Sequence, residues 1–216
     1  MILAKIISNR QISENIYLLT LERKIDFLPG QVISLSINNI PPRYYSIASG
    51  TDDDFIDILY TVKKEGVLTP QLIKLKKDDK ISYSPARGTF LNAQKKAVWI
   101  ATGTGIAPFI SMARSDKNFQ NYLGGLYHGT TLDFHYGSDF FAQTLTHKYF
   151  RFSSQKENIS PQIIKGRVTD RIKAQENLDK SADYYLCGKA EMVVEVRDLL
   201  IQKGIPFSAI KSEIYF

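Results

Sequence analysis

The feature that most constrains this chain is the segment TGTGIAP, residues 102–108, which follows the apolar run 97–101. A strand that ends in two glycines and continues as a helix leaves backbone N–H groups uncovered at the turn, where phosphate binds well. Glycines at 103 and 105 permit backbone angles and a close ligand approach that a Cβ would block. Pro108 suits a first helical turn. The segment therefore predicts a nucleotide-binding unit, and a tight turn without ligand is the alternative.

The chain before this segment has the pattern of short strands separated by turns. We expect the strands at residues 2–7, 16–21, 32–37, 44–48, 55–62 and 80–84. Turn residues such as Pro29-Gly30 and Pro41-Pro42 lie between them, and only 68–75 has a helical pattern. This arrangement is typical of a small antiparallel β-barrel.

From residue 93 onward, apolar strands alternate with segments of helical length, which indicates βα units around a parallel sheet. The expected strands are 98–101, 124–128, 150–153 and 183–186, and the expected helices are 108–114, 138–146 and 189–203. In the last helix one face is apolar, and Gly204 is placed as its C-terminal cap. We therefore expect two domains, a β-barrel over 1–92 and an α/β domain over 93–216.

Composition limits the classes of protein that remain. The 216 residues are 44% hydrophobic and 23% charged, as in ordinary globular domains. The single cysteine, Cys187, excludes an internal disulfide and a cysteine-rich metal site, and it favours a reducing cytoplasm. The N-terminus lacks a signal-peptide pattern, and no apolar run approaches the roughly 20 residues of a spanning helix. We expect no membrane insertion and no nucleic-acid partner.

The net charge of +6 divides into +2 before residue 93 and +4 after it. This surplus fits phosphate ligands or an acidic partner, and a solvated basic surface explains it equally well.

A second motif lies in the barrel half, where PRYYSIAS at 42–49 combines a cation, two aromatic rings and hydroxyl groups. Strand alternation places Arg43 and Tyr45 on one face and Tyr44 and Ser46 on the other. A planar ligand could meet a charge, a ring and a hydroxyl at the edge of this strand. Taken alone, the motif is a common strand composition.

In combination, these motifs resemble the ferredoxin–NADP(+) reductase family along nearly the whole chain. Six blocks occur in the family's order: Arg43-x-Tyr45-Ser46; Gly66-Val67-Leu68-Thr69 with Leu72; Pro85 to Phe90; Thr102 to Pro108; Cys187-Gly188 with Met192; and Glu213-Ile214-Tyr215-Phe216. The resemblance implies an FAD-binding barrel followed by an NADP-binding α/β domain. It is the order of the blocks, rather than any one of them, that is specific.

For the flavin, the resemblance implies that Arg43 holds the pyrophosphate, that Tyr45 lies against the isoalloxazine, and that Ser46 reaches toward N5. A planar charged fork and an aromatic face suit these tasks. The segment 66–69 corresponds to a second phosphate loop, with threonine at 69 where serine is usual. The strand at 60–63 would flank the flavin with its backbone. The cofactor-binding residues expected on the barrel are Arg43, Tyr44, Tyr45, Ser46, Tyr60, Val62, Gly66, Val67, Leu68 and Thr69.

For the nicotinamide dinucleotide, the resemblance places Thr104, Gly105 and Pro108 under the pyrophosphate. Cys187 and Gly188, with Met192 behind them, would lie near the nicotinamide ring. The thiol would shape the geometry of hydride transfer rather than act as a nucleophile. An inert buried cysteine is the alternative.

The tail resembles the bacterial branch of the family. Tyr215 corresponds to the aromatic ring that covers the flavin and moves aside for nicotinamide, and Phe216 corresponds to the ring beside the adenine. Glu213 corresponds to a carboxylate that helps proton delivery. The expected catalytic residues are therefore Ser46, Cys187, Glu213 and Tyr215; without the resemblance, a packed edge strand explains the same tail.

The choice between NADPH and NADH depends on cations around the 2′-phosphate. Bacterial members carry arginines after a His-Gly pair and in a Ser-Arg pair, whereas here Thr130 and Thr131 follow His128-Gly129, and Gln155 follows Ser154. Lys156 and Arg167 are the substitutes we expect, with Ser154 as a hydroxyl contact and His128 as a strand-end residue. We favour NADPH, with NADH as the alternative.

The expected activity is hydride transfer between NADP(H) and FAD between the two domains. The flavin would then exchange single electrons with a separate ferredoxin or flavodoxin. An NADH-dependent flavin or oxygenase reductase of the same superfamily, with FAD or FMN, and a non-catalytic nucleotide-binding module are the alternatives.

Overall fold

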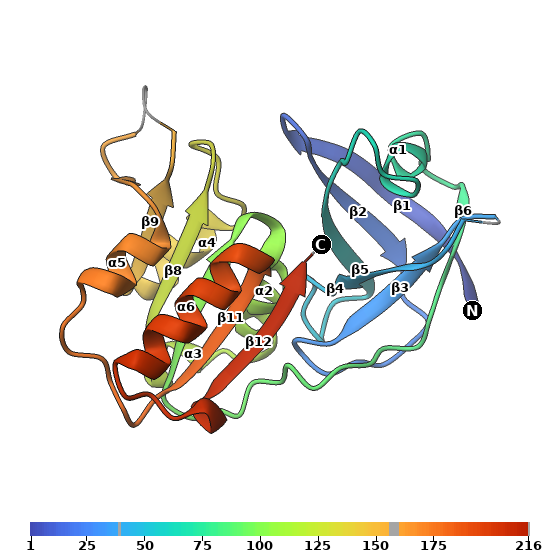
Figure 1. Ribbon diagram of the computed structural model, residues 1–216. Coiled ribbons are helices and arrows are strands. Elements are labelled where there is room, and N and C mark those ends of the chain that lie inside the picture. The colour runs from blue at the N-terminus through green and yellow to red at the C-terminus, as the bar shows by residue number, and fades with distance from the viewer. Residues whose placement is uncertain (39, 156–159, 216) are drawn as a thin grey trace. The chain divides into compact units, whose positions relative to one another are not determined.

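The computed structural model describes residues 1–38, 40–155 and 160–215 of the chain. The chain divides into two compact units, each with its own sheet (Figure 1). The first contains Met1–Asn92 and Ala107–Asp116, and the second contains Ala93–Ile106 and Lys117–Phe216.

The first unit is built on a six-stranded antiparallel sheet with the strand order β4-β3-β6-β1-β2-β5. Its strands are β1 (Ile2–Ser13), β2 (Ile16–Glu22), β3 (Val32–Ser36), β4 (Arg43–Ser46), β5 (Phe55–Thr61) and β6 (Lys80–Tyr83). The long strand β1 pairs with β6 through its first residues and with β2 through the rest. A bridge between Ile47 and Ile58 connects the end of β4 to β5, and so closes the sheet. The predicted antiparallel barrel is confirmed.

The core of the barrel is formed by side chains that alternate inward along the strands. It includes Ile6, Leu19, Leu21, Ile33, Leu35, Ile56, Ile58 and Tyr83. The short helix α1 (Thr69–Leu72) lies beside β1, whose Asn9 amide donates to the carbonyl oxygens of Leu72 at 2.8 Å and Leu75 at 3.0 Å. The helix expected over 68–75 is shorter than predicted because the N–H groups of Lys74 and Leu75 bond three residues back instead of four.

Helix α2 (Ala107–Ser115) follows the glycine loop and packs within the first unit. The ring of Phe109 meets the ring of Phe90 at 5.7 Å between centroids. The guanidinium of Arg114 forms an ion pair with Asp53 at 2.8 Å, and the Ser115 hydroxyl accepts the Thr51 N–H at 2.9 Å. By its contacts, the helix after the loop thus groups with the barrel.

The second unit is an all-parallel sheet with the strand order β10-β9-β8-β7-β11-β12. Its strands are β7 (Ala97–Thr102), β8 (Leu123–Thr130), β9 (Tyr149–Ser153), β10 (Ile164–Lys165), β11 (Asp183–Lys189) and β12 (Ile210–Tyr215). Its helical segments are η1 (Gly103–Ile106), α3 (Phe119–Tyr122), α4 (Ser138–Leu145), α5 (Val168–Ala174), α6 (Ala190–Gln202) and η2 (Phe207–Ala209). The predicted α/β sheet is confirmed.

Helices cover both faces of this sheet (Figure 1). On one face, Ile100 and Leu186 belong to an apolar cluster with Val193 and Val196 of α6 and with residues of α5. On the other face, the Trp99 ring stacks on Phe119 of α3, with centroids 5.8 Å apart and planes inclined by 3°. Burial on both faces explains why the central strands read as nearly continuous apolar runs.

Helix α6 follows the sequence pattern closely, whereas other elements of the second unit do not. Helix α6 ends as expected at Gly204, which has φ +84°. Helix α5 and strand β10 were not predicted, because β10 has only two residues and α5 carries polar residues at most of its positions, whereas β12 is the packed edge strand given as the alternative for the tail. Within the described residues, no helix combines the length and the apolarity that crossing a bilayer would take.

Candidate functional site

The second unit brings most of its predicted site residues to the carboxyl edge of the parallel sheet. The direction of strand addition reverses at β7, which has β8 on one side and β11 on the other. In open parallel sheets, ligands bind at such a switch point, outside the carboxyl ends of the strands. The glycine loop leaves β7 at this position, and Cys187 pairs with Ala101 of β7 near the end of β11.

Thr102, Gly105 and Gly188 interlock at this switch point. A Cβ on Gly105 would come within 2.4 Å of the Cys187 carbonyl oxygen, and one on Gly188 within 2.2 Å of the Thr102 hydroxyl. The same hydroxyl accepts the N–H of Lys189 at 3.1 Å. The glycine at 105 is therefore required by the neighbouring backbone, whereas a Cβ on Gly103 would meet nothing within 4 Å.

Cys187 is fully buried and its thiol contacts two side chains of the neighbouring strand β12. Its Sγ donates to the Glu213 Oε2 atom at 3.9 Å. Burial raises the pKa of the thiol well above its usual range; the Glu213 carboxylate raises it further, and the Tyr215 hydroxyl opposes the shift. Because β12 runs parallel to β11 and pairs Cys187 with Glu213, the register of this edge strand brings the three predicted residues together. The thiol remains protonated at neutral pH.

His128, near the end of β8, is buried and bonded through both ring nitrogens. Nε2 lies 3.1 Å from the Gly103 carbonyl oxygen, and Nδ1 lies 3.3 Å from the Tyr149 hydroxyl. Burial first, and the neighbouring His135 second, lower the pKa of His128 to about 3. A neutral ring that donates from Nε2 and accepts at Nδ1 satisfies both contacts.

The remaining predicted residues of the second unit have varied positions. Ser154 follows β9 and is exposed, and its N–H donates to the Thr130 carbonyl at 3.0 Å. Arg167 is exposed where α5 begins. Met192 is buried in the α6 cluster. The predictions for Lys156 and Phe216 lie outside the described residues.

In the first unit, β4 presents its four predicted residues in different environments. Arg43 and Tyr44 are exposed, Tyr45 is half-buried against the barrel core, and Ser46 is buried. Burial raises the pKa of Tyr45 to about 12, against the opposing effect of the Arg43 charge. The strand therefore offers a cation to solvent beside a protonated phenol.

The loop before α1 is closed by Thr69. Its hydroxyl accepts the Lys63 N–H at 2.9 Å, and the Gly66 N–H bonds to the Lys63 carbonyl at 2.9 Å. Val67, at the tip, is 62% exposed, whereas Leu68 and Thr69 are buried. The threonine that replaces the usual serine thus holds the loop in a compact turn.

Tyr60 and Val62 lie along β5 and its continuation. The Tyr60 ring is buried, stacks on Tyr17 at 5.5 Å and donates its hydroxyl to Asn9 at 3.0 Å, so that its side chain is part of the core. The Val62 N–H donates to the Asn15 carbonyl at 2.8 Å.

Sequence reasoning missed Thr102, Tyr149 and Arg87 as neighbours of the predicted residues. The Arg87 guanidinium donates to the Tyr44 hydroxyl at 3.0 Å and lies 5.3 Å from the centre of its ring. Arg87 lies inside the Pro85 to Phe90 block, so this block could have identified Arg87 as a site residue from the sequence. No such signal existed for Tyr149, because its contact depends on the register of two parallel strands.

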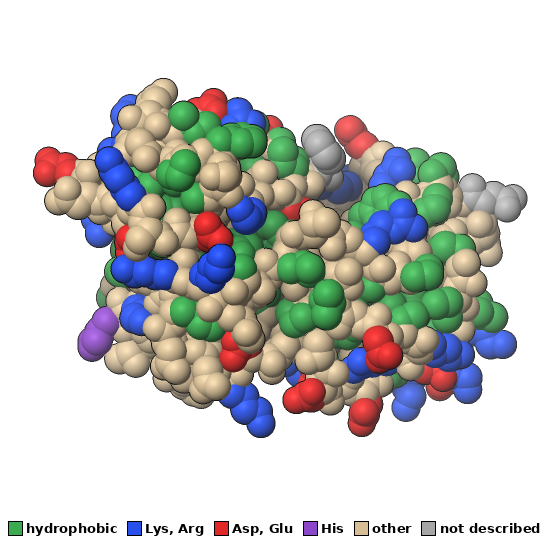
Figure 2. Space-filling view, turned by 90° about the horizontal axis from the view of Figure 1, so that it is seen from below, with side chains coloured by type: hydrophobic (Ala, Val, Ile, Leu, Met, Phe, Trp, Pro, Cys, Tyr) green, Lys and Arg blue, Asp and Glu red, His purple; other side chains and the backbone are tan. Residues whose placement is uncertain are grey.

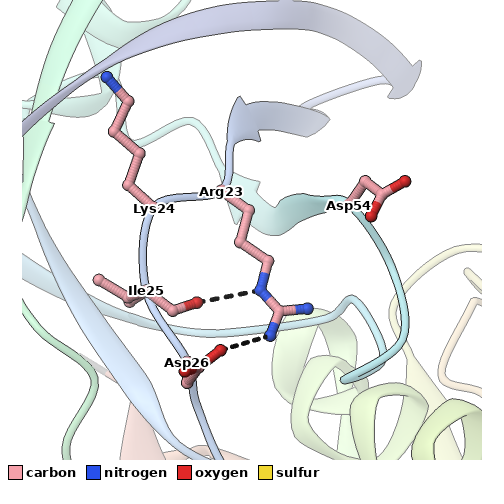
Figure 3. Close-up of a pocket in the computed structure, with 5 residues that line it drawn as sticks. All are labelled: Arg23, Lys24, Ile25, Asp26 and Asp54. Atoms are coloured by element: carbon pink, nitrogen blue, oxygen red, sulfur yellow. Dashed lines mark hydrogen bonds and ion pairs between the residues drawn. The ribbon is translucent and has the colours of Figure 1, made fainter.

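A hollow of about 350 Å³ on the first unit is lined by Arg23, Lys24, Ile25, Asp26 and Asp54, none of which is a predicted site residue. Arg23 donates to the carbonyl oxygens of Ile25, Thr51 and Asp53 and pairs with Asp26. Figure 3 shows Lys24 and Asp54 directed away from this guanidinium. Arg23 therefore links the segment 23–26 to the loop that contains Thr51 and Asp53 by hydrogen bonds. In the part of the chain that the structure describes, no group of three His, Cys, Asp or Glu side chains could hold a metal ion.

Comparison with known proteins agrees with this geometry. Residues 99–198 match the oxidoreductase NAD-binding domain family. A flavodoxin/ferredoxin–NADP reductase of Buchnera aphidicola is 27% identical over 93% of this chain and 90% of its own length. A ferredoxin NADP+ reductase from Neisseria gonorrhoeae, crystallised with FAD and NADP, superimposes with a TM-score of 0.86 at 20% identity, covering 100% of this chain and 98% of that one. The chain therefore carries an oxidoreductase NAD-binding domain and is similar, along nearly its whole length, to ferredoxin–NADP(+) reductases.

Two further relatives have names other than ferredoxin–NADP reductase. The electron transfer subunit of dihydroorotate dehydrogenase B (NAD(+)) from Clostridium acetobutylicum is 29% identical over 94% of this chain and 78% of its own length. The toluate 1,2-dioxygenase electron transfer component of Pseudomonas putida is 28% identical, and this chain spans 63% of its length. The relatives of this chain thus include proteins named as reductases and proteins named as an electron transfer subunit or component.

Proposed function

We propose that this chain is a flavoprotein oxidoreductase that transfers hydride between NAD(P)H and FAD and passes electrons to a separate protein. The observation that carries the proposal is the contact of the buried Cys187 thiol with Glu213 beside the glycine loop of β7. A protonated thiol and a carboxylate at the switch point of a parallel sheet suit a nicotinamide site. Both groups are polar, and a protonated thiol does not attack the nicotinamide ring as a thiolate would.

The donor set of the first unit fits the FAD pyrophosphate and ring. Arg43 is exposed, and its guanidinium lies 3.3 Å from the Pro42 carbonyl oxygen at the strand edge, which leaves its charge facing solvent. Backbone N–H groups in a compact turn such as the loop closed by Thr69 are suited to bind phosphate. Arg43 and residues 66–69 would hold the diphosphate, and Tyr45 and Ser46 would contact the isoalloxazine.

The glycine loop of the second unit fits a dinucleotide phosphate. Gly103 has φ +54° and open space where a side chain would be, so the backbone there can be approached closely. Thr104 and Gly105 would lie under the pyrophosphate, with Pro108 beginning the helix that follows. Ser154 and Arg167 would contact the adenosine end, and Met192 would support Cys187 and Gly188 from behind.

Bound FAD would supply the acceptor for hydride and the means to release electrons one at a time. The residues of this chain bind, orient and exclude water around it. The Cys187 thiol, which is protonated and buried from water, would shape the space for nicotinamide. Glu213 would hold a proton at its carboxylate near Tyr215, whose ring would cover the flavin until nicotinamide replaces it.

The test of the flavin is the visible spectrum of the purified protein. We expect yellow protein with flavin absorption bands, or binding of added FAD by a colourless preparation. Anaerobic mixing with NAD(P)H should then bleach these bands. A preparation that neither contains nor binds FAD contradicts the proposal, and so does a flavin that neither NADPH nor NADH reduces.

The electron acceptor is proposed to be a separate ferredoxin or flavodoxin in the reducing cytoplasm. The support is the name of the Buchnera relative and the net charge of +6. Figure 2 shows Lys and Arg side chains dispersed among Asp and Glu on the face it views, so that steering by this face would be weak. Reduction of purified ferredoxin and flavodoxin, each assayed at low and high salt, tests this. If the enzyme reduces neither ferredoxin nor flavodoxin, this result contradicts the proposed electron acceptor.

A specific observation also favours an NADH-dependent member of the superfamily. The Thr130 hydroxyl donates to the Leu132 carbonyl at the end of β8, where bacterial NADPH-dependent members carry a nearby arginine. The Clostridium relative is named for NAD(+). The ratio of kcat/KM for NADPH and NADH decides between the two coenzymes, because 2′-phosphate recognition needs cations that NADH does not use.

A further inference from the structure

His128 is placed to act on the glycine loop without reaching a ligand itself. Its side chain is 1% exposed and lies on β8, next to β7 in the sheet. Its Nε2 atom lies 3.1 Å from the carbonyl oxygen of Gly103, the first residue of the loop. Because a carbonyl oxygen can only accept, Nε2 must carry the hydrogen in this contact.

The tautomer of His128 is fixed by a second contact. The Tyr149 hydroxyl lies 3.3 Å from Nδ1. Burial raises the pKa of Tyr149, so its phenol keeps the proton that it donates to this nitrogen. The rings of His128 and His135 also form a T-shaped pair with centroids 4.9 Å apart, and the His135 Nε2 atom lies 3.2 Å from the His128 carbonyl oxygen and 3.0 Å from that of Phe152. His128 is thus held in one orientation, as a neutral donor from Nε2.

The contact determines which way the next peptide group points. The Gly103–Thr104 peptide bond is trans, since the described residues contain no cis peptide bond. In a trans peptide the C=O and the following N–H point in opposite directions. A Gly103 oxygen drawn toward His128 therefore turns the Thr104 N–H to the opposite side of the peptide plane, away from the histidine ring.

Gly103 begins the 3₁₀ helix η1, and the contact with His128 adds to the i→i+3 pattern of that helix in holding the orientation of its peptide group. Its φ of +54° lies in the left-handed region, and a Cβ there would meet no atom within 4 Å. Glycine adopts such angles without a steric penalty, but it also rotates away from them freely. A hydrogen bond from a fixed, buried donor removes that freedom.

We propose that His128, oriented by Tyr149, is a positioning residue that aims the Thr104 N–H at the dinucleotide pyrophosphate. The inference rests on the proposed function, because it assumes that residues 103–105 lie under this group. It adds that the loop is pre-organised from the neighbouring strand. A backbone donor fixed before binding contributes more to affinity than one that must be ordered on binding.

The experiment compares His128→Leu with His128→Gln in the FAD-loaded protein. Glutamine can place an N–H near the position of Nε2, whereas leucine fills the space without a donor. Binding of ADP-ribose, or of 2′-phospho-ADP-ribose if NADPH is the better reductant, is measured by calorimetry. We expect about tenfold weaker binding for His128→Leu, and binding within about threefold of the parent for His128→Gln.

The kinetic counterpart is a rise in KM for NAD(P)H with kcat little changed, which is the signature of lost ground-state binding. His147→Gln, at an exposed histidine, is the control and should match the parent protein. FAD content and melting temperature report folding separately from affinity.

Equal binding by His128→Leu and the parent overturns the inference, and so does equal weakening in both variants, since that would indicate packing rather than a hydrogen bond. If neither variant folds, Tyr149→Phe decides, with weaker ADP-ribose binding expected and unchanged binding overturning the inference. A parent protein that binds neither ADP-ribose form nor NAD(P)H is a different result, because it contradicts the proposed function itself.

Discussion

Gly105 lies so close to the Cys187 carbonyl that a methyl group at position 105 would come within 2.4 Å of the oxygen. The partner is backbone of β11, which cannot move aside as a flexible side chain can. The glycine loop and the predicted nicotinamide residue are therefore packed directly against each other.

Gly105→Ala should destabilise the second unit and weaken NAD(P)H binding, because either the loop or β11 must shift. Overpacking of this kind typically costs about 1–3 kcal/mol. Gly103→Ala is the matched control, since its Cβ has open space and the cost is about 1–2 kcal/mol from the left-handed φ alone. Thermal unfolding and the KM for NAD(P)H measure both effects. If Gly105→Ala is as stable as Gly103→Ala, the close approach is not a constraint.

Thr102→Val should loosen the turn after β11, because it removes the hydroxyl that accepts the Lys189 N–H at 3.1 Å. The expected cost is about 1 kcal/mol, the usual net value of such a hydrogen bond. Thr102→Ser keeps the acceptor and should stay close to the parent protein. Thermal unfolding of the two variants makes the comparison. Equal stability of valine and serine at this position would show that the hydroxyl does not hold the turn.

The sequence predicted the elements of this fold well, because its strands and long helices are marked by apolar periodicity and turn residues. Strand β12 was predicted only as the alternative for the tail, since its alternation of Lys211, Glu213 and Tyr215 does not look like a buried strand. The sequence motif assigned the glycine at 105 to ligand approach, whereas the structure shows a packing partner for it, the Cys187 carbonyl. Such partners depend on how two distant strands are aligned, and no local pattern encodes that register. The same reason hid the Tyr149–His128 contact.

Thr69→Val should weaken FAD binding, because the loop 63–69 loses the hydroxyl that accepts the Lys63 N–H. We expect up to about a tenfold increase in the Kd for FAD, since the net contribution of such a part-buried hydrogen bond is about 0.5–1.5 kcal/mol. Thr69→Ser, the residue usual in the family, should bind FAD like the parent. Titration of the flavin-free protein with FAD, followed by quenching of flavin fluorescence, measures the Kd. Unchanged binding by the valine variant would separate the loop from the flavin site.

The buried Asp57 should make the free energy of unfolding of the barrel depend on pH. Its carboxyl is buried, accepts the Thr20 hydroxyl at 2.7 Å and lies 3.7 Å from the Arg114 guanidinium. Burial raises its pKa and Asp53 adds to the rise, against the opposing effects of Thr20, Arg114 and Arg10. Since the folded pKa is raised, the stabilisation is complete below the unfolded pKa and is lost as pH rises through the folded value.

Asp57→Asn imitates the protonated carboxyl at every pH and keeps an acceptor for Thr20. The melting temperature of this variant relative to the parent should therefore increase between pH 4 and pH 8. Asp57→Ala is the control: it leaves the Thr20 hydroxyl without a partner, and it should be less stable than Asp57→Asn by about 1–3 kcal/mol at every pH, because neither variant titrates at this position. Melting curves at four pH values test this. A constant difference between Asp57→Asn and the parent across the range would show that the Asp57 charge is not disfavoured in the fold, because Arg114 would then compensate fully for its burial.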